Sequence, residues 1–306
     1  MNYTLHQLQI FQKIVECESV TKAAQELYLS QPAVSIQLKK FQDQFSIPLT
    51  EVVGRKLYIT DFGKEIATAA ERILNEVEAI TYKTMAYQGE LSGKLKFSIV
   101  STAKYVLPYF LSGFMADARG VDLNINVTNK ASVLRSLEEN KVDFALVSVI
   151  PDLLKINKVQ LMQNKLFLVA SSKLKVGKRS KWKFLEDVPL IYREEGSATR
   201  AAMEDFIEKN ALPTYKKMEM MSNEALKQAV IAGLGCSIMP LIGIRDSLKN
   251  GELQIIPTKG LPIITHWNLI WLTSKRLSPV ALAFLDYVER EKDMIIQDTF
   301  EWFERY

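Results

Sequence analysis

A glutamine, a serine and two lysines in one short predicted helix have the chemistry needed to recognise nucleic acid. Gln31 and Ser35 lie four residues apart, which places them on the same helical face. Both side chains can hydrogen-bond to base edges, and Lys39 and Lys40 can reach phosphates. The predicted DNA-binding residues of this helix are Gln31, Pro32, Ala33, Ser35, Gln37, Lys39 and Lys40. The alternative is an ordinary helical hairpin with a solvated polar face.

Residues 21–41 supply the two helices that position these side chains. Ala23 and Leu27 lie on the apolar face of the first helix, where small residues allow close helix contact. Ser30 is a good N-cap for the second helix, and Pro32 fits its first turn. The buried face of the second helix is marked by Val34, Leu38 and Phe41. The pattern predicts two short helices joined by a tight turn.

A second group of polar side chains stands where predicted strands end and predicted helices begin. Helix N-termini present free N–H groups and a partial positive charge, so they suit anions. Arg200 can also pair directly with a carboxylate or phosphate. Taken alone, each hydroxyl is better explained as a plain N-cap. Their convergence across one cleft predicts an anion site formed by Ser101, Thr102, Asn129, Ser148, Ser197, Thr199 and Arg200.

Three segments resemble catalytic or cofactor-binding motifs but lack residues that those motifs require. Residues 233–235 follow a predicted helix, and Ile238 occupies the third glycine position of a dinucleotide fingerprint. Ser197 lacks the glycines of a nucleophile elbow. Glu194 and Glu195 are adjacent, so on an extended segment they point apart rather than act as a carboxylate pair. We therefore predict no enzyme, and an enzyme with a DNA-binding appendage is a disfavoured alternative.

The two cysteines and two histidines are Cys17, Cys236, His6 and His266. Their wide separation predicts no metal site and no cofactor. Cys236 has apolar neighbours, which predicts a buried inert thiol. A redox switch through this thiol is the alternative. The N-terminus lacks a signal-peptide pattern, and the longest apolar run is too short for a membrane span, which predicts a cytoplasmic protein without membrane contact.

The composition of the chain is that of a soluble globular protein. It has 306 residues, of which 48% are hydrophobic and 24% charged, and this length suggests two or three domains. The net charge is only +4, so affinity for DNA has to come from local placement of cations.

Two further elements follow the helical pair. A hairpin is predicted over residues 47–60, with Arg55 and Lys56 at its tip, where a wing can grip the DNA backbone or minor groove. A solvated turn is the alternative. A helix is predicted over residues 61–87, with a heptad seam of Ile66, Ala70, Ile73, Val77, Ile80, Thr84 and Tyr87. Such a seam predicts pairing with a second copy, or packing on the chain's own C-terminal domain.

After a break at residues 88–93, strands and helices alternate along the chain. The predicted strands are 95–100, 123–127, 144–148, 165–170 and 189–193. The predicted helices begin at 103 and cover 132–139, 199–209 and 223–232. This alternation predicts an α/β architecture with parallel strand pairs.

The motif AAxxLxxSQPAVSxQLK at residues 23–39 resembles the DNA-binding domain of LysR-type transcriptional regulators. Residues 141–147, 193–200, 223–240 and 277–288 resemble the effector-binding domain of that family, which is similar in fold to periplasmic binding proteins. The sequences of residues 193–200 and 223–240 look most like those of the subgroup that includes regulators of carbon fixation. The resemblance covers essentially the whole chain.

The resemblance implies three parts and a two-lobed C-terminal domain. The implied parts are an N-terminal all-α winged helix-turn-helix domain over 1–60, a dimerisation helix over 61–89, and an α/β effector-binding domain over 90–306. Lobe I is expected at about 92–161 and 268–306, lobe II at about 162–267, with chain crossings near 160–166 and 266–270.

The resemblance also implies partners and a mode of action. The expected protein is a homodimer or homotetramer that binds double-stranded DNA and responds to a small, anionic effector. RNA polymerase is a further candidate partner, and a constitutive DNA-binding protein with a vestigial cleft is an alternative. Arg55, Lys56 and Thr60 match the family's wing. Thr50 and Val52 replace a usual aromatic residue and arginine, which puts one phosphate contact in doubt.

Overall fold

The computed structural model describes residues 2–54, 56–87, 91–151, 153–175, 185, 188–212 and 216–306, with the side chains of 78, 79 and 81–87 left aside. These residues form two compact units, divided between Glu90 and Leu91. Each unit is described on its own.

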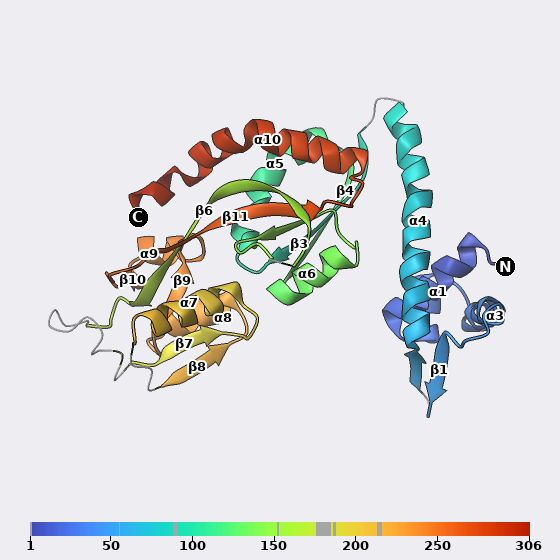
Figure 1. Cartoon of the computed structure of the whole chain (residues 1–306), viewed down its shortest axis with the longest axis horizontal. Coiled ribbons are helices and arrows are strands. Elements are labelled where there is room, and N and C mark those ends of the chain that lie inside the picture. Colours follow the sequence, from blue (N-terminus) through green and yellow to red (C-terminus); the bar gives the residue numbers. More distant parts are fainter. Residues whose placement is uncertain are drawn as a thin grey trace. The chain divides into compact units, whose positions relative to one another are not determined.

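The first unit is a helical bundle with a two-stranded wing (Figure 1). Its elements are α1 (Leu5–Cys17), α2 (Val20–Glu26), α3 (Gln31–Gln42), β1 (Thr50–Val53), β2 (Lys56–Ile59) and α4 (Asp61–Tyr87). Ser30 caps α3 by accepting a hydrogen bond from the Ala33 N–H. The Thr60 hydroxyl accepts one from the Gly63 N–H and so caps α4. The predicted bounds of the last helix, 61–87, are confirmed.

Helix α1 holds the unit together because two of its faces are buried. Phe11 packs with Phe41 of α3, their ring centroids 5.2 Å apart. On another face, Ile14 belongs to a cluster with Ala23 and Val34. Buried Phe41 and Val34 therefore fix the rotation of α3, and with it the direction of its polar face.

The apolar seam of α4 divides between two environments. Ala70 is only 1% exposed, in the same cluster as Phe11, and Ile66 packs against that cluster. The prediction that Ala70 lies on a surface for a second copy is therefore wrong: its own domain covers it. Ile73, Val77 and Ile80 are exposed. The side chains of Thr84 and Tyr87 lie outside the described residues.

The second unit is built on a seven-stranded sheet of order β10-β6-β11-β5-β3-β4, with β9 also paired to β6. Its strands are β3 (Ser92–Val100), β4 (Gly120–Thr128), β5 (Phe144–Val147), β6 (Ile156–Ser171), β9 (Ser237–Pro240), β10 (Leu253–Ile255) and β11 (Ile263–Leu272). Strand β3 pairs in parallel with β4 and β5, as predicted, whereas β6, β9, β10 and β11 pair antiparallel. The expected parallel pattern thus holds for only part of the sheet.

Two long strands connect two lobes. Strand β6 pairs with β11 along most of its length. Strand β5 pairs with the C-terminal half of β11, whereas β9 and β10 pair with the C-terminal end of β6. The predicted crossings fall within β6 and β11, and the register shifts between His266 and Asn268. The predicted strand 165–170 is therefore only the second half of a longer one, because polar residues before it continue the pairing.

Helices flank the sheet in both lobes (Figure 1). The first lobe carries η1 (Ala103–Tyr105), α5 (Leu107–Asp117), α6 (Lys130–Glu138) and the C-terminal α10 (Pro279–Phe300) with η4 (Glu301–Arg305). The second carries α7 (Ala198–Lys209), α8 (Asn223–Ile231), η3 (Leu241–Gly243), α9 (Arg245–Lys249) and the parallel pair β7 (Leu190–Arg193) and β8 (Lys217–Met220). The helix predicted from 103 begins as η1 and becomes regular only at Leu107.

The segment 233–235 forms a turn into a buried strand. Gly233 has a φ of +84°, which favours glycine. A side chain at Gly235 would meet the carbonyl oxygen of Pro189. Strand β9 then begins at Ser237, and all four of its residues are buried. Gly233 therefore serves the turn and Gly235 the close packing of the strand.

Candidate functional site

The polar face of α3 is exposed in the first unit. The Gln31 amide donates a hydrogen bond to the Ser35 hydroxyl over 3.0 Å, so the two side chains share one face. Gln31, Lys39 and Lys40 are exposed and Ser35 is half-buried. Neither lysine forms an ion pair with any described residue. This face presents hydrogen-bonding groups at one end and unpaired cations at the other.

The other predicted residues of α3 contribute unequally. Pro32 is exposed and Ala33 is half-buried. Gln37 is half-buried, and its side-chain oxygen accepts a hydrogen bond from Gln7 of α1 over 3.3 Å. Part of the Gln37 amide is thus used inside the domain.

Two exposed apolar residues beside this face were not predicted as site residues. Tyr28, in the turn before α3, is 95% exposed and has a φ of +56°, which is strained for a tyrosine. Ile36 is exposed on α3 itself. Large apolar side chains in an otherwise polar segment are the signal that could have found them.

The wing is held against α3 by a hydrogen bond from Thr50. Its hydroxyl donates to the Gln42 side-chain oxygen over 2.8 Å, and its N–H donates to the same atom. Val52 is exposed on β1. Lys56 is exposed, with its ammonium 5.3 Å from the centre of the Tyr58 ring. The predicted DNA contact Arg55 lies outside the described residues.

A cleft in the second unit brings together six of the seven predicted anion-binding residues. Its predicted lining residues are Ser101, Thr102, Asn129, Ser148, Ser197 and Thr199. They follow β3, β4, β5 and β7, at the carboxyl ends of parallel strands, and Thr199 lies in the first turn of α7. The Asn129 side chain also caps α6, whereas Ser197 makes no side-chain capping bond.

The strongest charges in the cleft are those of Arg193 and Glu194, neither of which was predicted as a site residue. Arg193 is 4% exposed and Glu194 is 8% exposed. The Arg193 Nε and Nη2 atoms donate to the two carboxylate oxygens of Glu194, each over 2.7 Å. Removing one partner of a buried pair costs about 3–5 kcal/mol, because the other charge is left uncompensated. The pair is therefore the electrostatic centre of the cleft.

Ser101 connects this pair to the opposite lobe. Its hydroxyl oxygen accepts hydrogen bonds from Arg193 Nη2 over 3.2 Å and from Asn223 Nδ2 over 2.8 Å. Ser101 follows β3, whereas Arg193 ends β7 and Asn223 begins α8. The three side chains thus bridge the two lobes at the cleft.

Arg200 does not line the cleft, so its predicted role in binding an anion is not supported. Its guanidinium pairs with Glu204 over 2.8 Å and with Glu219 of β8 over 2.6 Å. It also donates to the Arg193 backbone oxygen over 3.0 Å. These contacts occupy the hydrogen-bond donors of the Arg200 guanidinium outside the cleft. Through its bond to the Arg193 backbone, Arg200 helps to hold the end of β7 in place.

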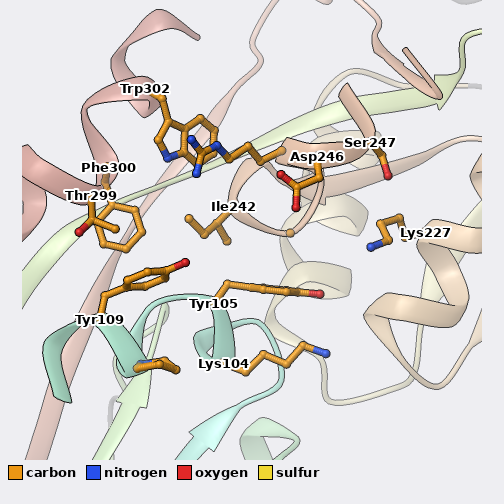
Figure 2. A pocket seen from close by; sticks show the side chains of 13 residues that line it. Lys104, Tyr105, Tyr109, Lys227, Ile242, Asp246, Ser247, Thr299, Phe300 and Trp302 are labelled. Carbon is orange, nitrogen blue, oxygen red and sulfur yellow. The ribbon is translucent and has the colours of Figure 1, made fainter. Parts of the chain in front are cut away.

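A larger hollow lies elsewhere in the unit, where η1, α9 and the C-terminal segment meet (Figure 2). Its volume is about 270 Å³, compared with about 20 Å³ for the cleft. Trp302, Tyr105 and Tyr109 surround it. Its cations have partners already: Lys227 pairs with Glu224 over 2.9 Å, and the Arg245 guanidinium lies 4.6 Å from the Trp302 ring centre.

The small cleft is the better candidate for an anion site in spite of its size. It combines a buried guanidinium with hydroxyl and amide groups from both lobes, and fixed polar groups give a pocket its specificity. The larger hollow has more room, but Lys227 and Arg245 in its lining already have partners.

Cys236 lies in the core of the second lobe. The residue is fully buried, and desolvation raises the pKa of its thiol to about 12. A thiol with so high a pKa is protonated at neutral pH and is a poor nucleophile. The surroundings favour the inert thiol over the redox switch.

Together, the two units define a class of protein. A winged helix-turn-helix with an exposed polar helix accompanies a two-lobed α/β unit whose cleft carries a buried, charge-paired arginine. This is the architecture of a ligand-responsive DNA-binding protein. No helix among the described residues is long and apolar enough to cross a membrane.

The comparisons with known proteins agree with that class. Residues 5–64 match the family described as bacterial regulatory helix-turn-helix protein, lysR family, and residues 88–293 match the LysR substrate binding domain. The chain belongs to the LysR family.

Its similar relatives include regulators of carbon metabolism. The chain is 37% identical over 289 residues to the HTH-type transcriptional activator CmpR of Synechocystis, covering 94% of this chain and 95% of that one. It is 35% identical to the RuBisCO operon transcriptional regulator of Acidithiobacillus ferrooxidans, covering 93% of each. The CcmR regulatory domain of Synechocystis, solved in complex with 2-PG, is 28% identical with a TM-score of 0.61, covering 66% of this chain and 98% of that one.

Proposed function

We propose that this protein is a transcriptional regulator whose promoter binding is controlled by a small anion bound in the cleft of the second unit. Helix α3 reads base edges, the wing and the lysines of α3 contact phosphates, and the exposed apolar face of α4 pairs two copies. A dimer is needed because one recognition helix contacts too few bases to select a site in a genome. Such a regulator acts in the cytoplasm, on the chromosome, and needs no catalytic step.

The observation that carries the proposal is Arg193, a buried cation that faces a cleft of hydroxyl and amide groups. An effector with a carboxylate or a phosphate matches the fork of a guanidinium. The CcmR regulatory domain was solved with 2-PG, that is 2-phosphoglycolate, which carries both a carboxylate and a phosphate. The proposed effector class is therefore a small phosphorylated carboxylic acid, and the proposed targets are carbon-fixation genes, as in the relatives.

A footprint on genomic fragments from the source organism tests the proposal. The full-length protein should protect a dyad-symmetric site, and 2-phosphoglycolate or another anion in a panel should change its length or register. By linkage, the effector shifts DNA binding only as far as it prefers one arrangement of the protein. Unrelated neutral metabolites are the control. A footprint that no anion changes would contradict the effector assignment and leave DNA binding in place.

A further inference from the structure

Glu194 holds Arg193 in the way that a bound anion would. The two carboxylate oxygens each accept a hydrogen bond of 2.7 Å, one from Nε and one from Nη2. This two-point contact is the usual geometry between arginine and a carboxylate or phosphate. The edge of the guanidinium that suits an anionic ligand is therefore occupied by a residue of the protein itself.

The cleft has no space for a ligand in addition to Glu194. Its volume is about 20 Å³, which is room for about one water molecule. Sites for small molecules are usually several hundred cubic ångströms, roughly 300–1,000 Å³. A metabolite can therefore enter only if a group that now fills the cleft moves out.

Charge identifies Glu194 as the group that must move. Among the described lining residues, Arg193 and Lys130 are cations and Glu194 is the acid. An anion bound to Arg193 beside Glu194 would place like charges together away from water, which is strongly unfavourable. If Glu194 leaves as the anion enters, the buried guanidinium exchanges one partner for another.

The local backbone allows this movement. Strand β7 ends at Arg193, so Glu194 stands outside the strand pairing. The Glu194 carbonyl accepts a hydrogen bond from the Ser197 N–H, which closes a turn around Gly196, with a φ of +83° and open space beside it. Glu195, the next residue, is already exposed. Rotation of the Glu194 side chain towards solvent would break no strand hydrogen bond.

We propose that Glu194 is a resident anion that occupies the effector's place on Arg193, and that effector binding displaces it. This inference rests on the proposed function, because it names the step by which the same cleft would respond. Arg193 also donates to Ser101 of the other lobe. Exchange of its partner therefore changes a contact between the lobes. Without effector, Glu194 keeps the arginine neutralised and the cleft closed.

Calorimetric titration of the full-length protein tests the proposal, with 2-phosphoglycolate and inorganic phosphate as separate probes. Glu194→Gln keeps the size of the side chain and removes its charge. We expect it to bind both probes at least about tenfold more tightly than the unaltered protein, because no carboxylate competes for Arg193. Glu194→Asp, which shortens the reach, should give a smaller gain. Glu195→Gln, the adjacent exposed residue, should change affinity by less than about twofold.

Each outcome bears on the proposal. Equal or weaker binding of both probes by Glu194→Gln and Glu194→Asp would overturn it, as would a loss of folding in both variants, since Glu194 would then be a structural partner only. If the unaltered protein binds neither probe, Glu194→Gln must still acquire phosphate binding. A gain by Glu194→Gln together with a promoter footprint that ignores every anion would support the resident anion and defeat the proposed function.

Discussion

The two surfaces that we propose bind anions, the polar face of α3 and the cleft of the second unit, have opposite electrostatic arrangements. Lys39 and Lys40 are exposed on α3 and make no ion pair with the residues that the structure describes. Arg193 is buried and fully engaged by Glu194. Water solvates an exposed cation, so it can remain unpaired until DNA arrives. A buried cation needs a partner at all times. DNA binding should therefore be graded and salt-dependent, whereas the effector response should depend on one residue.

The largest expected effect comes from removing the buried cation. Arg193→Gln should weaken effector binding by about 3–5 kcal/mol, which is roughly 100-fold to several thousand-fold, because it deletes the charge that pairs with the anion. Calorimetry with 2-phosphoglycolate measures this loss. The footprint without effector should be unchanged.

Arg200→Gln is the matched control for that prediction. Arg200 lies seven residues away and pairs with Glu204 and Glu219 outside the cleft, so effector affinity should change by less than about threefold. The double variant Arg193→Gln/Glu194→Gln removes both charges and guards against unfolding caused by an unpaired Glu194. If Arg200→Gln lost more affinity than Arg193→Gln, the cleft would be assigned to the wrong arginine.

The next effect concerns the pairing that makes two DNA faces act together. Val77→Arg places a charge on the exposed apolar face of α4. We expect the dimer to dissociate at least about 100-fold more readily, since each of the two copies loses the burial of one valine, about 1.5–3 kcal/mol per copy. Sedimentation equilibrium measures this change. Glu76→Arg, at the adjacent exposed position, is the control. Unchanged self-association of Val77→Arg would show that this face does not pair.

A smaller effect is expected from single cations on the exposed surface. Lys39→Ala should weaken binding to all DNA sequences similarly and reduce the slope of log affinity against log salt by about 1 per protomer. Gln31→Ala should instead change base preference, because its amide reaches base edges. Binding measured at several salt concentrations on cognate and altered sites separates the two. If Gln31→Ala bound every sequence as before, the recognition face would be misplaced.

The difference between the two surfaces also explains what could be predicted from the sequence. Helix period alone placed Gln31 and Ser35 on one face, because side-chain direction on a helix is set locally. Ser101 and Asn129 were correctly predicted to line the cleft, because ligand sites in α/β folds lie at the carboxyl ends of parallel strands. Arg193 was missed although it ends the buried strand β7, where a charged residue is unusual enough to be a signal.

The remaining errors came from contacts that local sequence does not contain. Arg200 looked available, but Glu219, far along the chain, pairs with it. Ala70 fitted the heptad seam, but Phe11 and Phe41 belong to the core that covers it. Periodicity identifies an apolar face, and only the tertiary structure shows which partner covers that face.

The smallest expected effect tests whether any other buried group takes part in the response. Burial raises the pKa of the Cys236 thiol from 9.0 to about 12, so it stays protonated across the range in which a free thiol ionises. In a Cys17→Ser background, alkylation of the folded protein should be slow at neutral pH, and its rate should keep rising with pH beyond about pH 9, where the rate of a free thiol levels off. Cys236→Ser should leave the footprint unchanged with and without peroxide. If the unaltered protein gave a peroxide-dependent footprint and Cys236→Ser did not, the thiol would be a second sensor beside the cleft.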